Sequence, residues 1–169
     1  MRSKPESAGV VGIPAGLRTI PDASRRARGP VVVIECFEEI PCDPCHDACR
    51  RGAIRPFDDI CHLPEVDFDK CNGCGACISV CPGLAIFVVD ESWKEDRAVV
   101  RLPYEFVPLP GPEDIVKCLD RNGKECCEAR VIKVEETNRH DRTAVIWVEV
   151  PKALSMDVRH IRVGGKAVG

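Results

Sequence analysis

Residues 71–82 read CNGCGACISVCP, and the spacing of their cysteines constrains the fold of this chain more than any other feature. The pattern CxxCxxCxxxCP lets a tight loop wrap three thiolates around one [4Fe–4S] cluster while the fourth thiolate reaches another cluster. Gly73 and Gly75 permit positive φ, so backbone N–H groups can approach cluster sulfur. Pro82 stops the ordinary continuation of a helix. The segment predicts an iron–sulfur site that uses Cys71, Cys74, Cys77 and Cys81.

Zinc is the alternative occupant of this motif, because CxxC pairs also suit tetrahedral zinc. A zinc ribbon needs two CxxC pairs, however, and has no use for a third cysteine at this spacing or for the terminal Cys-Pro. The motif therefore favours iron–sulfur over zinc.

A related cysteine pattern lies 32 residues before this motif in the sequence. We call the upstream pattern the first motif and residues 71–82 the second motif. The pairs that this shift superimposes are Cys42/Cys74, Cys45/Cys77, Cys49/Cys81, Ala53/Ala85, Ile54/Ile86 and Asp58/Asp90. Each half reads as a cysteine loop, a short helix and a β-rich exit. The repeat predicts a small α+β unit with pseudo-twofold symmetry.

The cysteine content also bears on the cellular compartment. The chain has 12 cysteines in 169 residues, which requires either disulfides or metal. Residues 1–29 lack the apolar region of a signal peptide, so we expect a cytoplasmic protein with reduced cysteines. No apolar run approaches the length of a transmembrane helix. Residues 1–30, rich in Pro, Gly, Ser and Arg, are expected to be flexible or ordered by a partner.

Charge is distributed unevenly along the chain. Residues 1–29 carry six Lys/Arg against two Asp/Glu, whereas residues 35–95 carry five against thirteen. Phosphate binding depends on a clustered positive surface, so the acidic body argues against nucleic acid as a partner.

The residue pattern of residues 96–169 is typical of a small β-rich domain. Prolines at 103, 108, 110 and 112 predict that strands in this stretch are short or at an edge. Asn122-Gly123 predicts a tight hairpin, which as a two-residue turn would place Cys118 opposite Cys127. Residues 143–150 and 158–163 are predicted strands. The segment therefore predicts a small β-barrel or sandwich that begins near residue 96 and serves subunit docking.

Three cysteines of this segment, Cys118, Cys126 and Cys127, have two interpretations. A third metal site or a redox pair is conceivable. Free cysteine packs well in small cores and the cytosol keeps most thiols reduced, so packing is the favoured role.

Residues 31–92 resemble a bacterial-type ferredoxin domain with two [4Fe–4S] clusters, and we assign the predicted domain to residues 31–95. In that family the fourth cysteine of each motif ligates the opposite cluster. The resemblance implies one cluster on Cys71, Cys74, Cys77 and Cys49, and a second on Cys36, Cys42, Cys45 and Cys81.

The first motif departs from this family in two places. Five residues, FEEIP, separate Cys36 from Cys42 where the family has two, and Arg50 replaces the proline after Cys49. We expect the insert to bulge outward. If Cys36 failed to reach the cluster, the site could hold a three-iron cluster or recruit Cys61. Otherwise Cys61 reads as a small packed side chain.

A looser resemblance spans residues 35–163. The runs ECFEEIPCDPC, LPEVDFDKCNGCGACISVCPGLAIFVVD and RLPYEFVPLP are similar to the small iron–sulfur subunits of FAD-dependent proline and hydroxyproline dehydrogenase-type complexes. Those complexes pair two flavoprotein subunits with a ferredoxin-like one, sometimes with a [2Fe–2S] unit. The resemblance implies a relay of single electrons between flavins during oxidation of an amino or imino acid.

This chain is expected to have no catalytic site of its own. It lacks a dinucleotide fingerprint, so any FAD is expected on partner subunits. A free ferredoxin that serves several partners is the main alternative. A redox-responsive regulator that binds nucleic acid is a weaker one, because residues 96–169 carry 13 Lys/Arg against 12 Asp/Glu.

Overall fold

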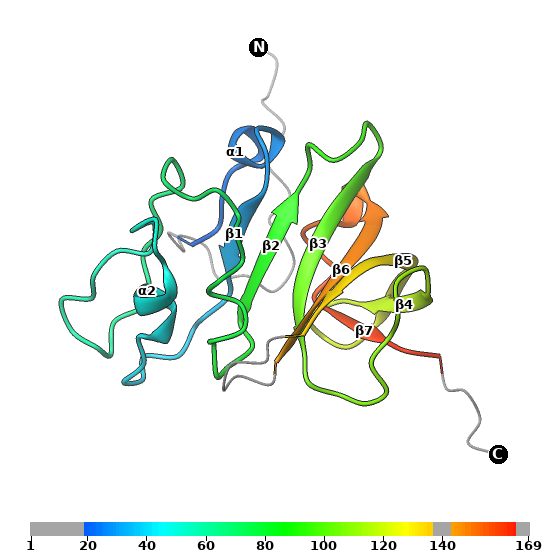
Figure 1. Ribbon diagram of the computed structural model, residues 1–169. Helices are drawn as coiled ribbons and strands as arrows, with labels where there is room; N and C mark the ends of the chain where they lie inside the picture. The colour runs from blue at the N-terminus through cyan, green and yellow to red at the C-terminus, as the bar shows by residue number, and fades with distance from the viewer. Residues whose placement is uncertain (1–18, 137–142, 165–169) are drawn as a thin grey trace, which may run out of the picture.

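The computed structural model describes residues 19–136 and 143–164, which are mostly antiparallel sheet with few helices (Figure 1). The elements are α1 (Ala23–Ala27), β1 (Val31–Ile34), α2 (Pro44–Ala48), β2 (Ile86–Asp90), β3 (Arg97–Tyr104), β4 (Ile115–Leu119), β5 (Glu125–Glu135), β6 (Ala144–Pro151), the 3-10 helix η1 (Lys152–Leu154) and β7 (His160–Arg162). The strands form one sheet in the order β1-β2-β3-β6-β5-β4-β7.

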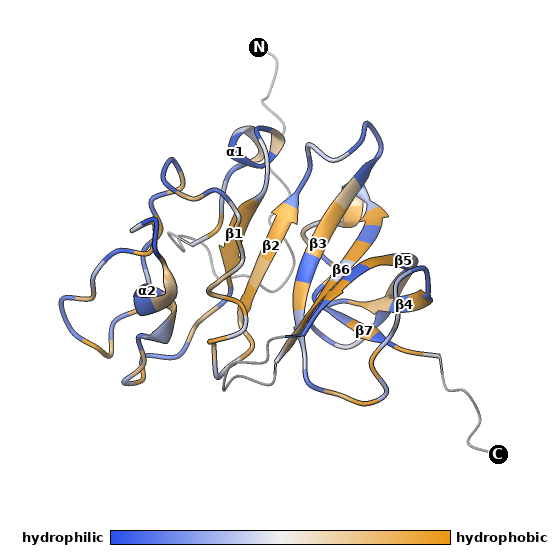
Figure 2. Ribbon diagram, viewed as in Figure 1, coloured by the Kyte–Doolittle hydropathy of each residue, from blue (hydrophilic) through white to orange (hydrophobic). Residues whose placement is uncertain are grey.

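Strands β1 and β2 form the centre of the molecule and are buried on both faces. They pair from Val31↔Val89 to Ile34↔Ile86, and all of these residues are buried. Val33 and Val89 belong to the core of the C-terminal strands, whereas Ile34 and Ile86 belong to a second core beneath the cysteine loops. A strand buried on both faces has an uninterrupted apolar sequence, which Figure 2 shows for both strands.

The C-terminal strands form a strongly curled, barrel-like sheet. The start of β7 lies close to the end of β3, where the rings of His160 and Tyr104 stack with centroids 5.7 Å apart. Strand β2 pairs with β3 from Val88↔Arg101 to Asp90↔Val99, so the hydrogen-bonded sheet continues across residue 96. The division into domains at residues 31–95 and 96–169 stays a prediction.

Strand β3 differs from the expectation of short or edge strands around the prolines. It is eight residues long and pairs over its whole length with β6, including Pro103↔Val145. On its other side β2 pairs only as far as Arg101. Pro103 therefore lies where β3 has no second neighbour, and its missing N–H removes no ladder hydrogen bond.

The hairpin between β4 and β5 forms at the predicted place with a longer turn. The backbone N–H of Asp120 donates to the carbonyl of Lys124, and Gly123 has φ of 78°. Three residues thus lie in the loop instead of two, and a bulge around Cys126 compensates for the extra residue. The predicted pairing Cys118↔Cys127 is confirmed.

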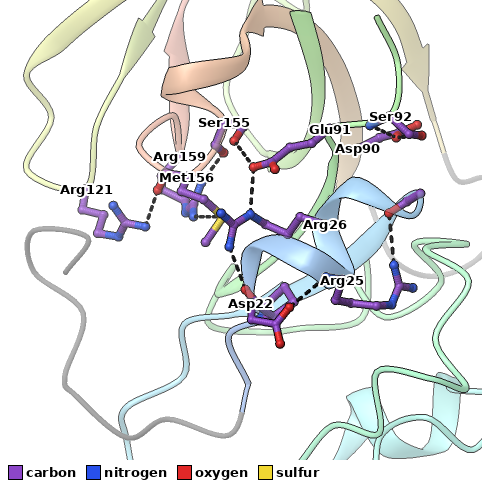
Figure 3. A network of polar contacts seen from close by, with 12 residues as sticks. Asp22, Arg25, Arg26, Asp90, Glu91, Ser92, Arg121, Ser155, Met156 and Arg159 are labelled. Atoms are coloured by element: carbon purple, nitrogen blue, oxygen red, sulfur yellow. Dashed lines mark hydrogen bonds and ion pairs between the residues drawn. The ribbon is translucent and has the colours of Figure 1, made fainter. Parts of the chain in front are cut away.

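Part of the N-terminal extension is ordered by this chain itself, in contrast to the flexible or partner-ordered segment that we expected. The α1 side chain Arg25 is buried and donates to the carbonyls of Phe68 and Cys71 at 2.8 and 2.6 Å. Arg26 pairs with Glu91 at 2.8 Å, and Glu91 also accepts from the Ser155 hydroxyl (Figure 3). These long-range bonds order residues 19–29, whereas residues 1–18 lie outside the described part of the chain.

The helices of residues 19–136 and 143–164 are too short or too polar to cross a bilayer.

Candidate metal centres

Eight of the nine cysteines of residues 36–81 line two separate hollows, four cysteines to each. Site A consists of Cys49, Cys71, Cys74 and Cys77, which line a hollow of about 20 Å³. Site B consists of Cys36, Cys42, Cys45 and Cys81, which line a hollow of about 250 Å³. Each site takes a cysteine from the opposite motif, Cys49 in site A and Cys81 in site B.

Equivalent hydrogen bonds show how the repeat builds the two sites. The N–H of Glu35 donates to the carbonyl of Ala85 at 2.8 Å. The equivalent bond in the other half runs from the N–H of Asp67 to the carbonyl of Ala53 at 2.7 Å, because Asp67 lies 32 positions after Glu35 and Ala53 lies 32 positions before Ala85. The strand pair Ile34↔Ile86 and the bridge Ile54↔Val66 are related by the same shift. The pairing at the two ends of the ferredoxin-like unit is therefore pseudo-twofold.

The fourth cysteine of each motif also has an equivalent environment. The Sγ atom of Cys49 accepts from the N–H of Ala53 at 3.3 Å, and that of Cys81 accepts from Ala85 at 3.5 Å. Gly52 and Leu84 follow at equivalent positions with φ of 62° and 51°. Backbone N–H groups thus point at the cysteine sulfur in both halves, and such hydrogen bonds tune the potential of iron–sulfur clusters.

The halves differ in their secondary structure. The helix α2 occupies the first motif, with Pro44 at its first turn, whereas residues 76–80 of the second motif form turns. The second half leaves through the full strand β2, while the first half has only the bridge at Ile54. The expectation of a short helix in each half is therefore wrong for the second motif.

Two arginines, the buried Arg25 and the partly buried Arg101, hold the loop of site A. Arg25 donates to the carbonyl of Cys71, and Arg101 of β3 donates to the carbonyl of Gly73 at 2.7 Å. The Arg101 guanidinium also stacks on the ring of Trp147, 3.6 Å from its centroid. A Cβ atom on Gly73 would lie 2.6 Å from the backbone of Pro30, so only glycine fits this turn.

An ion-pair network holds the start of site B. Glu35, directly before Cys36, accepts from Arg121 Nη2 at 2.6 Å and from Arg159 Nε at 2.7 Å. The side chains of Glu35 and Arg159 are only 7 and 4% exposed. A buried carboxylate between two guanidinium groups is stable because each charge is paired and hydrogen-bonded. The C-terminal strands therefore support both sites.

Burial favours the protonated form of several thiols in both sites, because it raises their pKa. Burial, followed by the charge of Cys71, raises the pKa of Cys77 far above its ordinary value. Burial and the charge of Cys81 raise the pKa of Cys45 to about 11. Burial also raises the pKa values of Cys36 and Cys42. Because iron binds thiolate, cluster assembly at either site must release these protons.

Cys36 and Cys61 are separated by the fold. Cys36 lines the hollow of site B beside Cys81, whereas Cys61 is not among the residues that line this hollow. The N–H of Cys61 instead donates to the carboxylate of Asp59 at 2.8 Å in a surface turn. The geometry favours Cys36 over Cys61 as the fourth thiol of site B.

The remaining cysteines lie in the barrel-like sheet. Cys118 is buried and pairs across the hairpin with Cys127, and the Cys126 thiol donates to the Cys118 carbonyl. Burial raises the pKa of Cys126 to about 11. Among residues 19–136 and 143–164, no three His, Cys, Asp or Glu side chains converge closely enough to hold a single metal ion.

Sequence reasoning missed the residues that support the cysteine loops. Arg25, Arg101 and Glu35 belong to no motif, and their partners lie far away in the sequence. Only the position of Glu35 beside Cys36, and of a charged Arg101 within an apolar strand, marks them in the sequence.

Comparison with known families identifies the second motif. Residues 64–87, which include Cys71, Cys74, Cys77 and Cys81, match the family described as "4Fe-4S binding domain". The chain contains a 4Fe–4S ferredoxin-type domain. The prediction of iron–sulfur over zinc at this motif is thereby supported.

Curated relatives of the ferredoxin-type domain come from several organisms. A protein of Methanosarcina acetivorans, named as a component of an ion-translocating oxidoreductase complex, is 45% identical over 47 residues, or 28% of this chain and 17% of the relative. The "Ferredoxin-type protein NapF" of Haemophilus influenzae is 44% identical over 69 residues, or 38% of this chain and 39% of the relative. An "Uncharacterized ferredoxin" of Methanocaldococcus jannaschii is 35% identical over 65 residues, covering 38% of this chain and 35% of the relative.

The similarity is confined to part of each protein. This chain covers less than two fifths of the length of these relatives, so it shares a ferredoxin-type domain with them and not a whole architecture. No solved structure matches the chain.

Proposed function

We propose that this chain is an electron-transfer subunit that relays single electrons through two [4Fe–4S] clusters, one at site A and one at site B. The observation that carries the proposal is the grouping of eight cysteines into two sets of four around separate hollows. A cluster with four thiolate ligands supplies one-electron transfer and has no open coordination position for substrate.

The residues of this chain fit such clusters in three respects. The sites offer four thiols each, and backbone N–H groups point at Cys49, Cys71 and Cys81 sulfur at 3.3–3.5 Å. The side chains of Arg25 and Arg101 keep the loop of site A in place. The exposed position of Cys74 brings one ligand of site A to the surface, where electrons can enter or leave.

We further propose that the partners are FAD-bearing subunits of a multisubunit amino or imino acid dehydrogenase in the cytoplasm. The FAD belongs to the partners, and a separate [2Fe–2S] subunit can complete the complex. Flavins convert two-electron hydride chemistry into single-electron steps, which is the task that requires a cluster relay. One relative is named as a component of an oxidoreductase complex, which supports a fixed place in a complex.

A free ferredoxin is the second candidate, because two of the relatives carry the word ferredoxin in their names. Purification from the native host without oxygen separates the candidates. Stable co-purification with a yellow flavoprotein supports the subunit, whereas elution of this chain alone, with its clusters, supports the free carrier.

Metal analysis tests the cluster count. The anaerobically purified chain is expected to contain about eight iron and eight acid-labile sulfide per chain. Finding zinc in place of iron, or a colourless preparation without sulfide, contradicts the proposal.

A matched pair of cysteine variants tests the ligand set of site B. Cys36→Ser is expected to remove about half of the iron, because Cys36 is the fourth thiol of the hollow. Cys61→Ser, an equally small change in a surface turn, is expected to leave the iron content unchanged. The reverse result would assign Cys61 to the cluster.

A further inference from the structure

The five-residue insert after Cys36 lies beside a surface turn of the middle of the chain. The N–H of Cys42 donates to the carbonyl of Ile60 at 3.2 Å, which joins the insert to residues 57–61. Phe37 and Ile40 line the hollow of site B together with Phe57. The two loops thus form one continuous surface over site B.

This surface exposes apolar side chains to solvent. Phe37 is 40% exposed, Ile40 is 51% exposed and Ile60 is 47% exposed. Scattered apolar residues on a surface need no explanation, but a group that covers one site indicates an interaction surface.

The same surface carries uncompensated negative charge. Residues 36–47 and 57–62 contain six Asp/Glu and no Lys or Arg. In the described part of the chain, Glu38, Glu39 and Asp58 form no ion pair with Lys or Arg, and the nearby charges of Arg121 and Arg159 are paired with Glu35. We call the surface formed by Phe37, Glu38, Glu39, Ile40, Asp58, Asp59 and Ile60 the acidic face.

We propose that the acidic face is the docking surface for an electron-transfer protein with a basic rim and an apolar centre, so that electrons pass through site B. This inference rests on the proposed cluster at site B. Opposite charges steer such partners together and raise the association rate, while a small apolar centre permits rapid dissociation.

The charge of the acidic face excludes other occupants. A second copy of this chain would bring carboxylates against carboxylates, and nucleic acid or an anionic membrane would be repelled in the same way. Phe106, Val107, Leu109 and Ile115 are also exposed, but none of them lines the hollow of site A or of site B.

Charge reversal tests the face with mitochondrial cytochrome c, a small basic haem protein, as the probe. We expect reduced holoprotein to reduce cytochrome c at a rate that falls with added salt. Glu38→Lys with Asp59→Lys is expected to lower this rate about tenfold at low salt. The control, Glu128→Lys with Glu136→Lys, reverses two exposed charges outside the acidic face and is expected to change it less than about twofold.

Two further measurements separate docking from damage. The rate with ferricyanide, a small anion, is expected to rise in the Glu38→Lys/Asp59→Lys variant, because the same charge change now attracts the acceptor. Affinity for zinc-substituted cytochrome c, which is redox-inert towards the resting protein, is expected to fall in this variant and after Ile60→Ser. The control Ile115→Ser changes an isoleucine that is 61% exposed elsewhere and is expected to leave affinity unchanged.

Iron and sulfide content distinguish failure of this inference from failure of the proposed function. A variant with full clusters and unchanged affinity for cytochrome c overturns the acidic face as a docking surface. A wild-type protein without clusters overturns the proposed function instead. Self-association of the wild-type chain that Glu38→Lys/Asp59→Lys abolishes would make a second copy the occupant and would also overturn the inference.

Discussion

Sites A and B share the same repeat but have opposite electrostatic surroundings. At site A, the guanidinium groups of Arg25 and Arg101 donate to carbonyls of the cysteine loop. At site B, the arginines are paired with Glu35, and the surface carries only carboxylates around the apolar side chains. Sequence duplication thus supplies two similar thiol sets, while the charged residues around them differ.

The C-terminal strands have a second role beside the docking role that we expected for them. Arg101 of β3 reaches site A, and Arg121 and Arg159, from the β4–β5 turn and the segment before β7, reach the residue before Cys36. The barrel-like sheet therefore supports the loops of both sites. Its contribution to subunit docking stays a proposal.

Removal of iron is expected to have the largest effect and to separate the two cores. Chelation under anaerobic conditions should disorder residues 36–85, because ligation supplies folding energy that the small core beneath the cysteine loops lacks. The core that includes Val100, Ile146 and Val148 contains no cluster ligand and should persist. Hydrogen exchange before and after chelation measures this difference. Equal loss of protection in β3 and β6 would show that the sheet depends on the clusters throughout.

Loss of the buried carboxylate is expected to destabilise site B selectively. Glu35→Gln leaves Arg159 buried without its counter-charge, at a cost of about 3–5 kcal/mol in the free energy of unfolding. Urea denaturation of the holoprotein measures the cost, and Glu128→Gln, on the surface, should change it by less than about 0.5 kcal/mol. If Glu35→Gln lowers the free energy of unfolding by less than about 1 kcal/mol, the Glu35–Arg159 ion pair contributes no more than a solvent-exposed pair, which would contradict the expectation.

Two glycine substitutions compare the turns of the two halves. Gly52 and Gly73 both have positive φ, but a Cβ on Gly52 meets open space whereas one on Gly73 would overlap the backbone of Pro30. Gly52→Ala should therefore cost about 1–2 kcal/mol for the backbone conformation alone. Gly73→Ala should cost more and should lower the iron content of site A. Thermal unfolding and metal analysis of the two variants measure both effects, and equal costs would contradict the close approach of Pro30.

The smallest expected effect is on a reduction potential. Arg101→Gln removes a positive charge beside the loop of site A, so reduction of the cluster proposed there should become less favourable. The equilibrium constant for its reduction should fall by up to about tenfold, which lowers the reduction potential by up to ~59 mV for one electron. Potentiometric titration followed by electron paramagnetic resonance, in a Cys36→Ser background, isolates site A. Arg101→Lys should restore most of the potential.

Lys133 provides the control for this charge. Its ammonium group also lies over Trp147, 4.8 Å from the ring centroid, but its side chain is 53% exposed. Lys133→Gln should therefore shift the potential less than Arg101→Gln, because solvent screens an exposed charge. Equal shifts in the two variants would assign the effect to overall charge and not to the contact with Gly73.

The accuracy of the sequence predictions follows the distance over which each feature is determined. The pairing Cys118↔Cys127 was predicted from a local turn signal, although the loop and the bulge at Cys126 differ in detail from a two-residue turn. The course of β3 was predicted less well, because the effect of Pro103 depends on where β2 ends. Residues 19–29 were misjudged because the hydrogen bonds of Arg25 reach residues more than 40 positions away.

The sequence by itself indicated the chemistry of the second cysteine motif, since cysteines two or three residues apart are placed by the geometry of one short loop. It also indicated β2, which forms the β-rich exit expected after the second cysteine motif. Only the tertiary structure decided that Cys36 rather than Cys61 lies with Cys42, Cys45 and Cys81, and that arginines 86 and 124 residues away hold Glu35. Such contacts depend on how the strands are ordered in the sheet, which no local pattern of residues encodes.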